Sequence, residues 1–134
     1  MWKKLTTASA LLLFLSACGS SAEDHREALQ KLGVVWDDEA FLSHAKEGDP
    51  AVLELFLKGG MDLEVRDSTG ATALMYAALN GYVEATSLLI EMGADVNAVD
   101  KLGRRALDYA TVHPESGAFR ILASAGALYG TAFR

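Results

Sequence analysis

The feature that most constrains the fold of this chain is an internal repeat with a period of 33 residues. Shifting the sequence by this period pairs Asp67 with Asp100 and Gly60 with Gly93, and the alignment needs no gap. The same shift aligns Leu55 with Leu88, Asp62 with Asp95, Gly70 with Gly103, Ala73 with Ala106, Leu74 with Leu107, Tyr76 with Tyr109 and Ala77 with Ala110. A fixed period of this kind indicates a protein built by stacking one small unit on the next.

The middle unit, residues 67–99, carries the start and stop signals of two short helices. Thr72 can cap a first helix over 73–80, and Gly81 can end it because glycine adopts a left-handed conformation without penalty. A second helix over 83–92 has small and apolar residues at helical spacing on one face. The unit is therefore predicted to be a helix-turn-helix followed by an extended segment.

The motifs of this unit closely resemble an ankyrin repeat. D-x-x-G precedes T-A-L-M, where the family usually has T-P-L-H, and L-L-I-x-x-G-A-D-V-N-A ends the unit. The resemblance covers Val34 to about Leu128. It implies an all-α solenoid of about three 33-residue helix-turn-helix units, at 34–66, 67–99 and 100–128. Three units are about the minimum for a stable stack.

The outer units depart from this pattern, as terminal units that screen an apolar end are expected to do. In the first unit, Asp37 and Glu39 replace the opening glycine and the capping threonine. We expect an absent or irregular finger there, the finger being the extended loop that leads into each unit, and an acidic helix start. His44 replaces a small alanine and should open a helix contact slightly. In the third unit, Pro114 replaces the glycine between the helices and is expected to open a helix over 115–123.

Short segments flank the repeats. Residues 25–33 belong to an amphipathic stretch from Glu23 to Leu32. We predict that they form an N-terminal capping helix that covers the exposed end of the stack. Residues 129–134 follow the repeats as a C-terminal tail.

The beginning of the chain has the layout of an export signal. Lys3 and Lys4 form a short basic head, an apolar run occupies 5–15, and small residues follow. This run of 11 residues is shorter than the about 20 that cross a bilayer as a helix. The pattern therefore favours a cleaved signal peptide over a transmembrane helix.

Residues 15–18, Leu-Ser-Ala-Cys, resemble the bacterial lipobox. The resemblance implies a signal peptide over 1–17, a lipidated Cys18 and a short linker over 18–24. The alternative is an ordinary signal peptide cut elsewhere, which would leave a lone thiol that has no intramolecular disulfide partner. In Gram-negative lipoproteins an aspartate after the cysteine commonly signals retention at the inner membrane. Gly19 stands there instead, so we expect an outer-membrane anchor that faces the periplasm.

The charge of the chain argues against several partners. The formal net charge is −6, and removal of the signal peptide with its two lysines makes it −8. A chain of this sign has no general attraction to phosphate backbones, so we expect no nucleic-acid binding. The acidity would also repel anionic lipid surfaces, which suits a domain held near a membrane without lying on it.

We find no catalytic pattern in the sequence. His25, His44 and His113 are far apart and lack metal-binding spacing, no G-x-S-x-G occurs, and the acidic run 37–39 lacks the oxygen spacing of an EF-hand. The aspartates at repeat-defining places are expected to brace turns, namely Asp62, Asp67, Asp95 and Asp100. We therefore predict no enzyme activity, no cofactor, no metal site and no small-molecule substrate.

The resemblance implies a concave protein-binding face made by the finger tips and the exposed side of each first helix. The matching positions are Arg66, Ser68, Thr69, Ala71, Val99, Lys101, Leu102 and Arg104 on the fingers, and Lys46, Glu47, Met75, Leu79, Asn80, Val112 and His113 on the first helices. Leu79, Val99, Leu102 and Val112 are apolar where exposure is expected. An apolar centre with a charged rim is typical of a protein contact site, although single exposed apolar residues are also normal. His113 could equally be a solvated turn residue.

Two hypotheses for function follow. The first is a membrane-anchored periplasmic lipoprotein that binds a still unknown partner protein through this face. It would act as an adaptor, or as an inhibitor or immunity protein of an exported enzyme or toxin, roles found among small exported ankyrin proteins of bacteria. The alternative is a structural scaffold of the cell envelope with several weaker partners.

Overall fold

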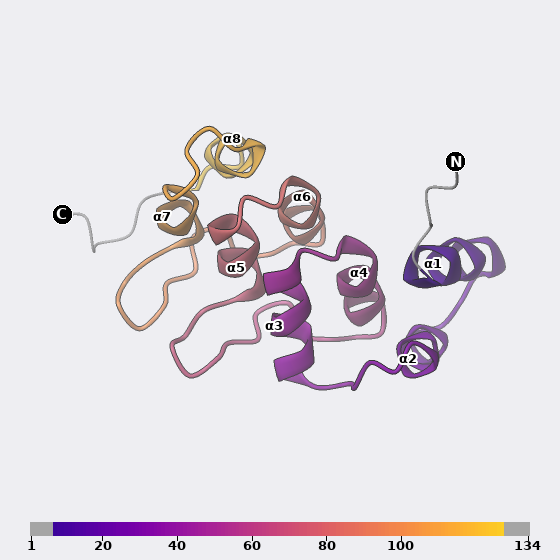
Figure 1. Cartoon of the computed structure of the whole chain (residues 1–134). Coiled ribbons are helices and arrows are strands. Elements are labelled where there is room, and N and C mark those ends of the chain that lie inside the picture. Colours follow the sequence, from indigo (N-terminus) through magenta and orange to yellow (C-terminus); the bar gives the residue numbers. More distant parts are fainter. Residues whose placement is uncertain (1–6, 128–134) are drawn as a thin grey trace.

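The computed structural model describes residues 7–127, and every regular element in that range is a helix. In chain order the helices are α1 (Thr7–Cys18), α2 (Ala22–Lys31), α3 (Asp38–Glu47), α4 (Pro50–Lys58), α5 (Ala73–Leu79), α6 (Val83–Glu91), α7 (Ala106–Ala110) and α8 (Gly117–Ser124). They stack in two rows, an inner row of α3, α5 and α7 and an outer row of α4, α6 and α8 (Figure 1). The all-α solenoid predicted from the repeat is confirmed.

Two long loops join successive units and project on the same side of the stack (Figure 1). We call residues 59–72 finger 1 and residues 92–105 finger 2. Only residues 32–37 separate α2 from α3, so the first unit has no comparable loop. The absent finger expected there is confirmed.

The helices of the middle unit begin where their local signals place them. Thr72 is the N-cap of α5, and its hydroxyl accepts a hydrogen bond from the Met75 amide at 3.4 Å. Asn80 and Met92, expected to be the last helical residues, are instead the C-caps of α5 and α6. Gly81 follows α5 with a φ of +69°, the left-handed conformation that favours glycine.

The acidic start of the first unit is also confirmed. Asp37 is the N-cap of α3, and its carboxylate accepts the Ala40 amide at 2.6 Å. The helix therefore begins at Asp38, ahead of the position that Glu39 marks in the repeat register. An aspartate satisfies the free amides of a helix start and complements the helix dipole, so this cap replaces the missing threonine.

The helix predicted over 115–123 is present as α8, but its start after Pro114 is predicted two residues too early. α8 begins at Gly117, with Ser116 as its N-cap accepting the Phe119 amide at 3.3 Å. Pro114 lies in the preceding turn, which is closed by a hydrogen bond from the Ser116 amide to the His113 carbonyl at 2.9 Å. Proline is favoured at the second position of such a turn, and serine is a strong helix cap. These two preferences together move the helix start past the proline.

The N-terminal end of the stack is covered by α2, as predicted. Ala28 and Leu29 are buried, and α2 packs against α4. Ser21 and Asp24 form a capping box, with the Ser21 amide 2.6 Å from the Asp24 carboxylate. Because of this cap, residues 22–24 are helical, and the linker expected over 18–24 is correspondingly shorter.

α1 lies across α2 and α4 and buries Ala8, Leu12 and Leu15. Among residues 7–127, no helix combines the length and apolarity needed to cross a membrane. The side chain of Cys18 and residues 129–134 lie outside what the structure describes. Lipidation of Cys18 therefore stays a prediction.

The first unit has an aromatic core. The Phe56 ring stacks on Trp36 with centroids 5.4 Å apart and meets the edge of Phe41 at 5.6 Å. His44 is half-buried at the border of this cluster, with its ring centroid 6.2 Å from that of Phe56. Aromatic pairs of this kind add about 0.5–1.5 kcal/mol beyond the burial of their area. The histidine is accommodated because it packs on a large ring at the core edge.

Candidate functional site

The surface predicted to bind a partner corresponds to the two finger tips and the inner helices α3, α5 and α7 (Figure 1). Of the residues predicted to line it, the exposed ones are Lys46, Glu47, Arg66, Ser68, Thr69, Asn80, Val99, Lys101, Leu102, Val112 and His113. Leu79 and Arg104 are half-buried, and Ala71 and Met75 are buried. Most of the predicted face is therefore available to a partner.

The placement of Ala71 and Met75 on this face is wrong, because each is only 1% exposed. The Met75 side chain turns toward the start of α5, where its sulfur accepts a hydrogen bond from the Thr72 amide at 3.4 Å. The Ala71 amide donates to the Asp67 carboxylate at 3.1 Å, on the inner side of the finger tip. Repeat register identifies a position in the unit, whereas the local turn decides which way its side chain points.

One carboxylate organises the tip of finger 2. Asp100 accepts the amides of Leu102 and Arg104, both at 2.9 Å, and the Tyr109 hydroxyl at 2.5 Å. The Arg104 guanidinium adds a charged contact to the same group at 2.9 Å and lies over the Tyr109 ring. Burial works to raise the pKa of Asp100, but these hydrogen bonds outweigh it and hold the pKa below its ordinary value. The tip is thus ordered before any partner binds.

Finger 1 repeats this construction. Asp67 accepts the Thr69 amide at 2.8 Å and the Thr69 hydroxyl at 2.6 Å, and the Tyr76 hydroxyl donates to its second oxygen. Partial burial works to raise the pKa of Asp67, but the two hydroxyl donors outweigh it and lower the pKa to about 2. Both aspartates therefore remain ionised at neutral pH, with their oxygens used inside the fingers.

The two finger tips are tied to each other. The Lys101 amide donates to the Thr69 carbonyl at 3.0 Å. The Arg66 guanidinium donates to the Gly70 carbonyl at 3.1 Å within its own finger and also to the Val99 carbonyl of the next. A Cβ on Gly70 would lie 2.9 Å from the Lys101 amide nitrogen, so the close approach needs a glycine. The fingers form one platform rather than two independent loops.

This platform presents apolar side chains beside cations. Leu102 is 68% exposed, Val112 60% and Val99 41%, which confirms their predicted exposure. In residues 7–127, no carboxylate lies within ion-pair distance of Arg66 or Lys101. An apolar centre bordered by charge matches the anatomy of protein contact sites.

Sequence reasoning missed a cavity of about 410 Å³ between α3 and finger 1. Its lining consists of Asp38, Glu39, Leu42, Lys46, Arg66, Asp67 and Ser68. The acids at the start of α3 face this space because the first unit has no finger to cover them. Asp38 and Glu39 have no acidic counterparts at the matching positions of the other two units. This difference was the signal in the sequence that could have indicated the cavity.

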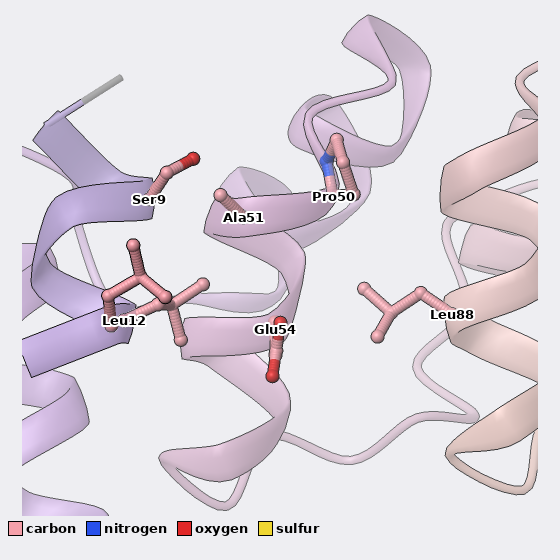
Figure 2. Close-up of a pocket in the computed structure, with 7 residues that line it drawn as sticks. Ser9, Leu12, Pro50, Ala51, Glu54 and Leu88 are labelled. Carbon is pink, nitrogen blue, oxygen red and sulfur yellow. The ribbon is translucent and has the colours of Figure 1, made fainter. Parts of the chain in front are cut away.

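A second cavity, of about 460 Å³, lies on the outer side between α1, α4 and α6. Figure 2 shows Ser9 and Leu12 of α1 facing Ala51 and Glu54 of α4, with Leu88 approaching from α6. Its one carboxylate, Glu54, is paired with Lys58 at 2.7 Å. The part of the chain that the structure describes contains no group of three His, Cys, Asp or Glu side chains that could hold a metal.

Comparison with known families identifies the repeats. The family model described as ankyrin repeats, in three copies, matches residues 41–131. No curated protein matches the chain significantly. The matched region includes both fingers and more than half of the chain, and such repeats are typically interaction modules without catalytic activity.

Proposed function

Because the chain belongs to the ankyrin-repeat family, whose units generally mediate protein–protein contacts, we propose that it is a lipid-anchored envelope protein that holds a dedicated partner protein on its finger platform. We define the finger platform as the tips of fingers 1 and 2 with the adjoining surface of α5 and α7. The partner is a periplasmic protein, and the chain acts on it as an adaptor or an inhibitor.

One observation carries the binding role. The exposed apolar groups Val99 and Leu102 stand on a tip held by Asp100 and linked to finger 1 through Arg66. Ordering a loop on binding costs conformational entropy, so a surface already ordered keeps more of its contact energy. Single exposed apolar residues are normal, but neighbouring ones gathered on one ordered tip form a patch of the kind that marks interaction sites.

The lipobox resemblance supports the anchoring role. Cleavage before Cys18 removes all of α1 except Cys18 itself, and the three residues 19–21 then separate the lipid from α2. Two or three acyl chains hold a protein stably where a single chain does not. The repeats would be held close to the periplasmic surface of the outer membrane.

The proposal is tested by chemical crosslinking in intact cells, followed by purification of the full-length lipidated protein with its crosslinked partners. The comparison is between the native chain, Leu102→Asp on the finger platform, and Met92→Asp at the end of the outer helix α6. Met92 is a matched control because it is also an exposed apolar residue, 40% exposed, but as the C-cap of α6 it lies at the start of finger 2 and not at its tip.

One dominant protein that is lost with Leu102→Asp and kept with Met92→Asp is the expected result. Several weak partners that survive both substitutions would contradict a dedicated partner and favour a structural scaffold of the envelope. In that case the contact surface would lie elsewhere on the stack.

A further inference from the structure

Building on the proposed function, we infer that the partner offers the finger platform an acidic segment in which a carboxylate stands next to an aliphatic or aromatic side chain. The carboxylate binds at Arg66 and Lys101, and the apolar group packs on Val99 and Leu102. This assigns the chemistry of the partner, which the repeat family leaves open.

The cations of the platform are available to a partner, whereas its anions are not. Arg66 donates to main-chain carbonyls, and the exposed Lys101 ammonium has no carboxylate within ion-pair distance in the described range. Asp67 and Asp100 are turned inward, each accepting hydrogen bonds from its own finger. The other acids near Arg66, Asp38 and Glu39, lie across the cavity between α3 and finger 1, so a segment that approaches the platform from the side of Lys101 meets positive charge.

The apolar contact lies next to this charge on the same tip. Leu102 follows Lys101 directly, and Val99 accepts the Arg66 guanidinium through its carbonyl while leaving its side chain 41% exposed. Because the Lys101 amide is hydrogen-bonded to the Thr69 carbonyl, the main chain that carries Lys101 and Leu102 is held in place, and the length of the lysine side chain limits the distance between the ammonium and the leucine. A partner must present an acid and an apolar group at a matching spacing.

The net charge of −6 strengthens the preference of an acidic partner for the finger platform over the rest of the surface. Like charges brought together across an interface cost several kcal/mol, so most of the acidic surface rejects an acidic partner. The finger platform is a local exception, and it fixes where and in which orientation such a partner can bind. Electrostatic complementarity of this kind acts mainly on association rate and specificity.

An anionic lipid surface has a similar chemistry but fits the molecule less well. Finger 2 leads into α7, at the opposite end of the stack from α1 and α2, where the proposed anchor lies (Figure 1). The negative net charge also opposes approach to anionic lipid. We therefore assign the platform to an acidic protein segment, and the experiment includes a lipid arm.

The test is selection of a random-peptide library on the full-length chain, with affinities of enriched peptides measured on variants. We expect peptides with Asp or Glu close to Leu, Ile or Phe. Lys101→Glu should weaken their binding about tenfold by placing like charges together. Arg120→Glu is the matched control, since Arg120 is an exposed cation of the outer helix α8, and it should have little effect. Replacing the peptide's acid with lysine should restore binding to Lys101→Glu.

Three results would overturn the inference. The first is a neutral or basic consensus, or no enrichment. The second is binding that Leu102→Asp abolishes but Lys101→Glu leaves unchanged, which would keep a protein partner on the platform while removing its acidic character. The third is Leu102-dependent sedimentation of the unlipidated Cys18→Ala chain with phosphatidylglycerol vesicles, which would reassign the platform to lipid.

Discussion

At the scale of single residues, an aspartate at each bend of the fingers holds the loop in place through hydrogen bonds to the main chain. Each accepts the amide two residues further along the chain, at 2.8–2.9 Å, in the pairs Asp62 with Glu64, Asp67 with Thr69, Asp95 with Asn97, and Asp100 with Leu102. The bracing role predicted for these aspartates is confirmed. Such side-chain turns stabilise the bend without any help from distant parts of the chain.

Asp67 should make the stability of the protein sensitive to acid. Its pKa is lowered from 3.8 to about 2 in the folded protein, so its stabilisation is complete above 3.8 and is lost as the pH falls toward about 2. We expect Asp67→Asn to lower the free energy of unfolding at neutral pH and to flatten its decline between those two values. Urea unfolding followed by circular dichroism at a series of pH values measures both effects.

Glu91→Gln is the control for the change in net charge, because it removes an exposed carboxylate at the end of α6, away from a helix start and from the fingers' turns. Its curve of stability against pH should keep the slope of the native chain in the same window. Identical slopes for the native chain and Asp67→Asn would show that the Thr69 and Tyr76 contacts do not stabilise the charged form.

At the scale of elements, the third unit shows how competing signals set a helix boundary. Ser116 caps α8, while Pro114 belongs to the turn before it. Ser116→Ala should therefore destabilise the protein by about 1 kcal/mol, a typical loss for a helix cap. Pro114→Ala should cost less, since it leaves the cap in place. Urea denaturation of the two variants compares them directly.

The opposite order of destabilisation would mean that the proline, not the serine, defines the start of α8. Thermal unfolding provides an independent check, because a lost cap lowers the midpoint temperature. Helical content at low temperature should stay unchanged in both variants, since neither substitution touches the packed side of the helix.

At the scale of the whole molecule, the two ends of the stack are built differently. α1 and α2 lie at the end that carries the proposed anchor, and finger 2 with α7 lies toward the other (Figure 1). A partner on the finger platform would thus be held away from the lipid by the length of the repeats. The negative net charge of the chain favours its solvation.

Lipidation at Cys18 is tested at this scale. Cells supplied with labelled palmitate should incorporate the label into the native protein and not into Cys18→Ala, because the thiol is the group that accepts the lipid. The purified variant should keep the helical circular dichroism of the repeats. Label retained in Cys18→Ala would reject the lipobox assignment, and Ser20→Ala, a nearby substitution outside the lipobox, should label normally.

The sequence alone determined the features that depend on short-range contacts. The 33-residue period predicted the stacked helix pairs, and Thr72, Asp37 and the turn aspartates were recognisable because their hydrogen bonds reach only two to four residues along the chain. The charged rim and the exposure of Leu102 were likewise visible in the repeat register. These signals are local, so neighbouring residues are sufficient to define them.

Only the tertiary structure decided which groups of the face are free. The link from Arg66 to Val99 joins residues 33 apart, and the burial of Met75 depends on how α5 packs between α3 and α7. The cavity beside Asp38 exists because the first unit lacks a finger. Whether a side chain is buried or a charge is compensated depends on atoms distant in sequence, and packing alone brings those atoms together.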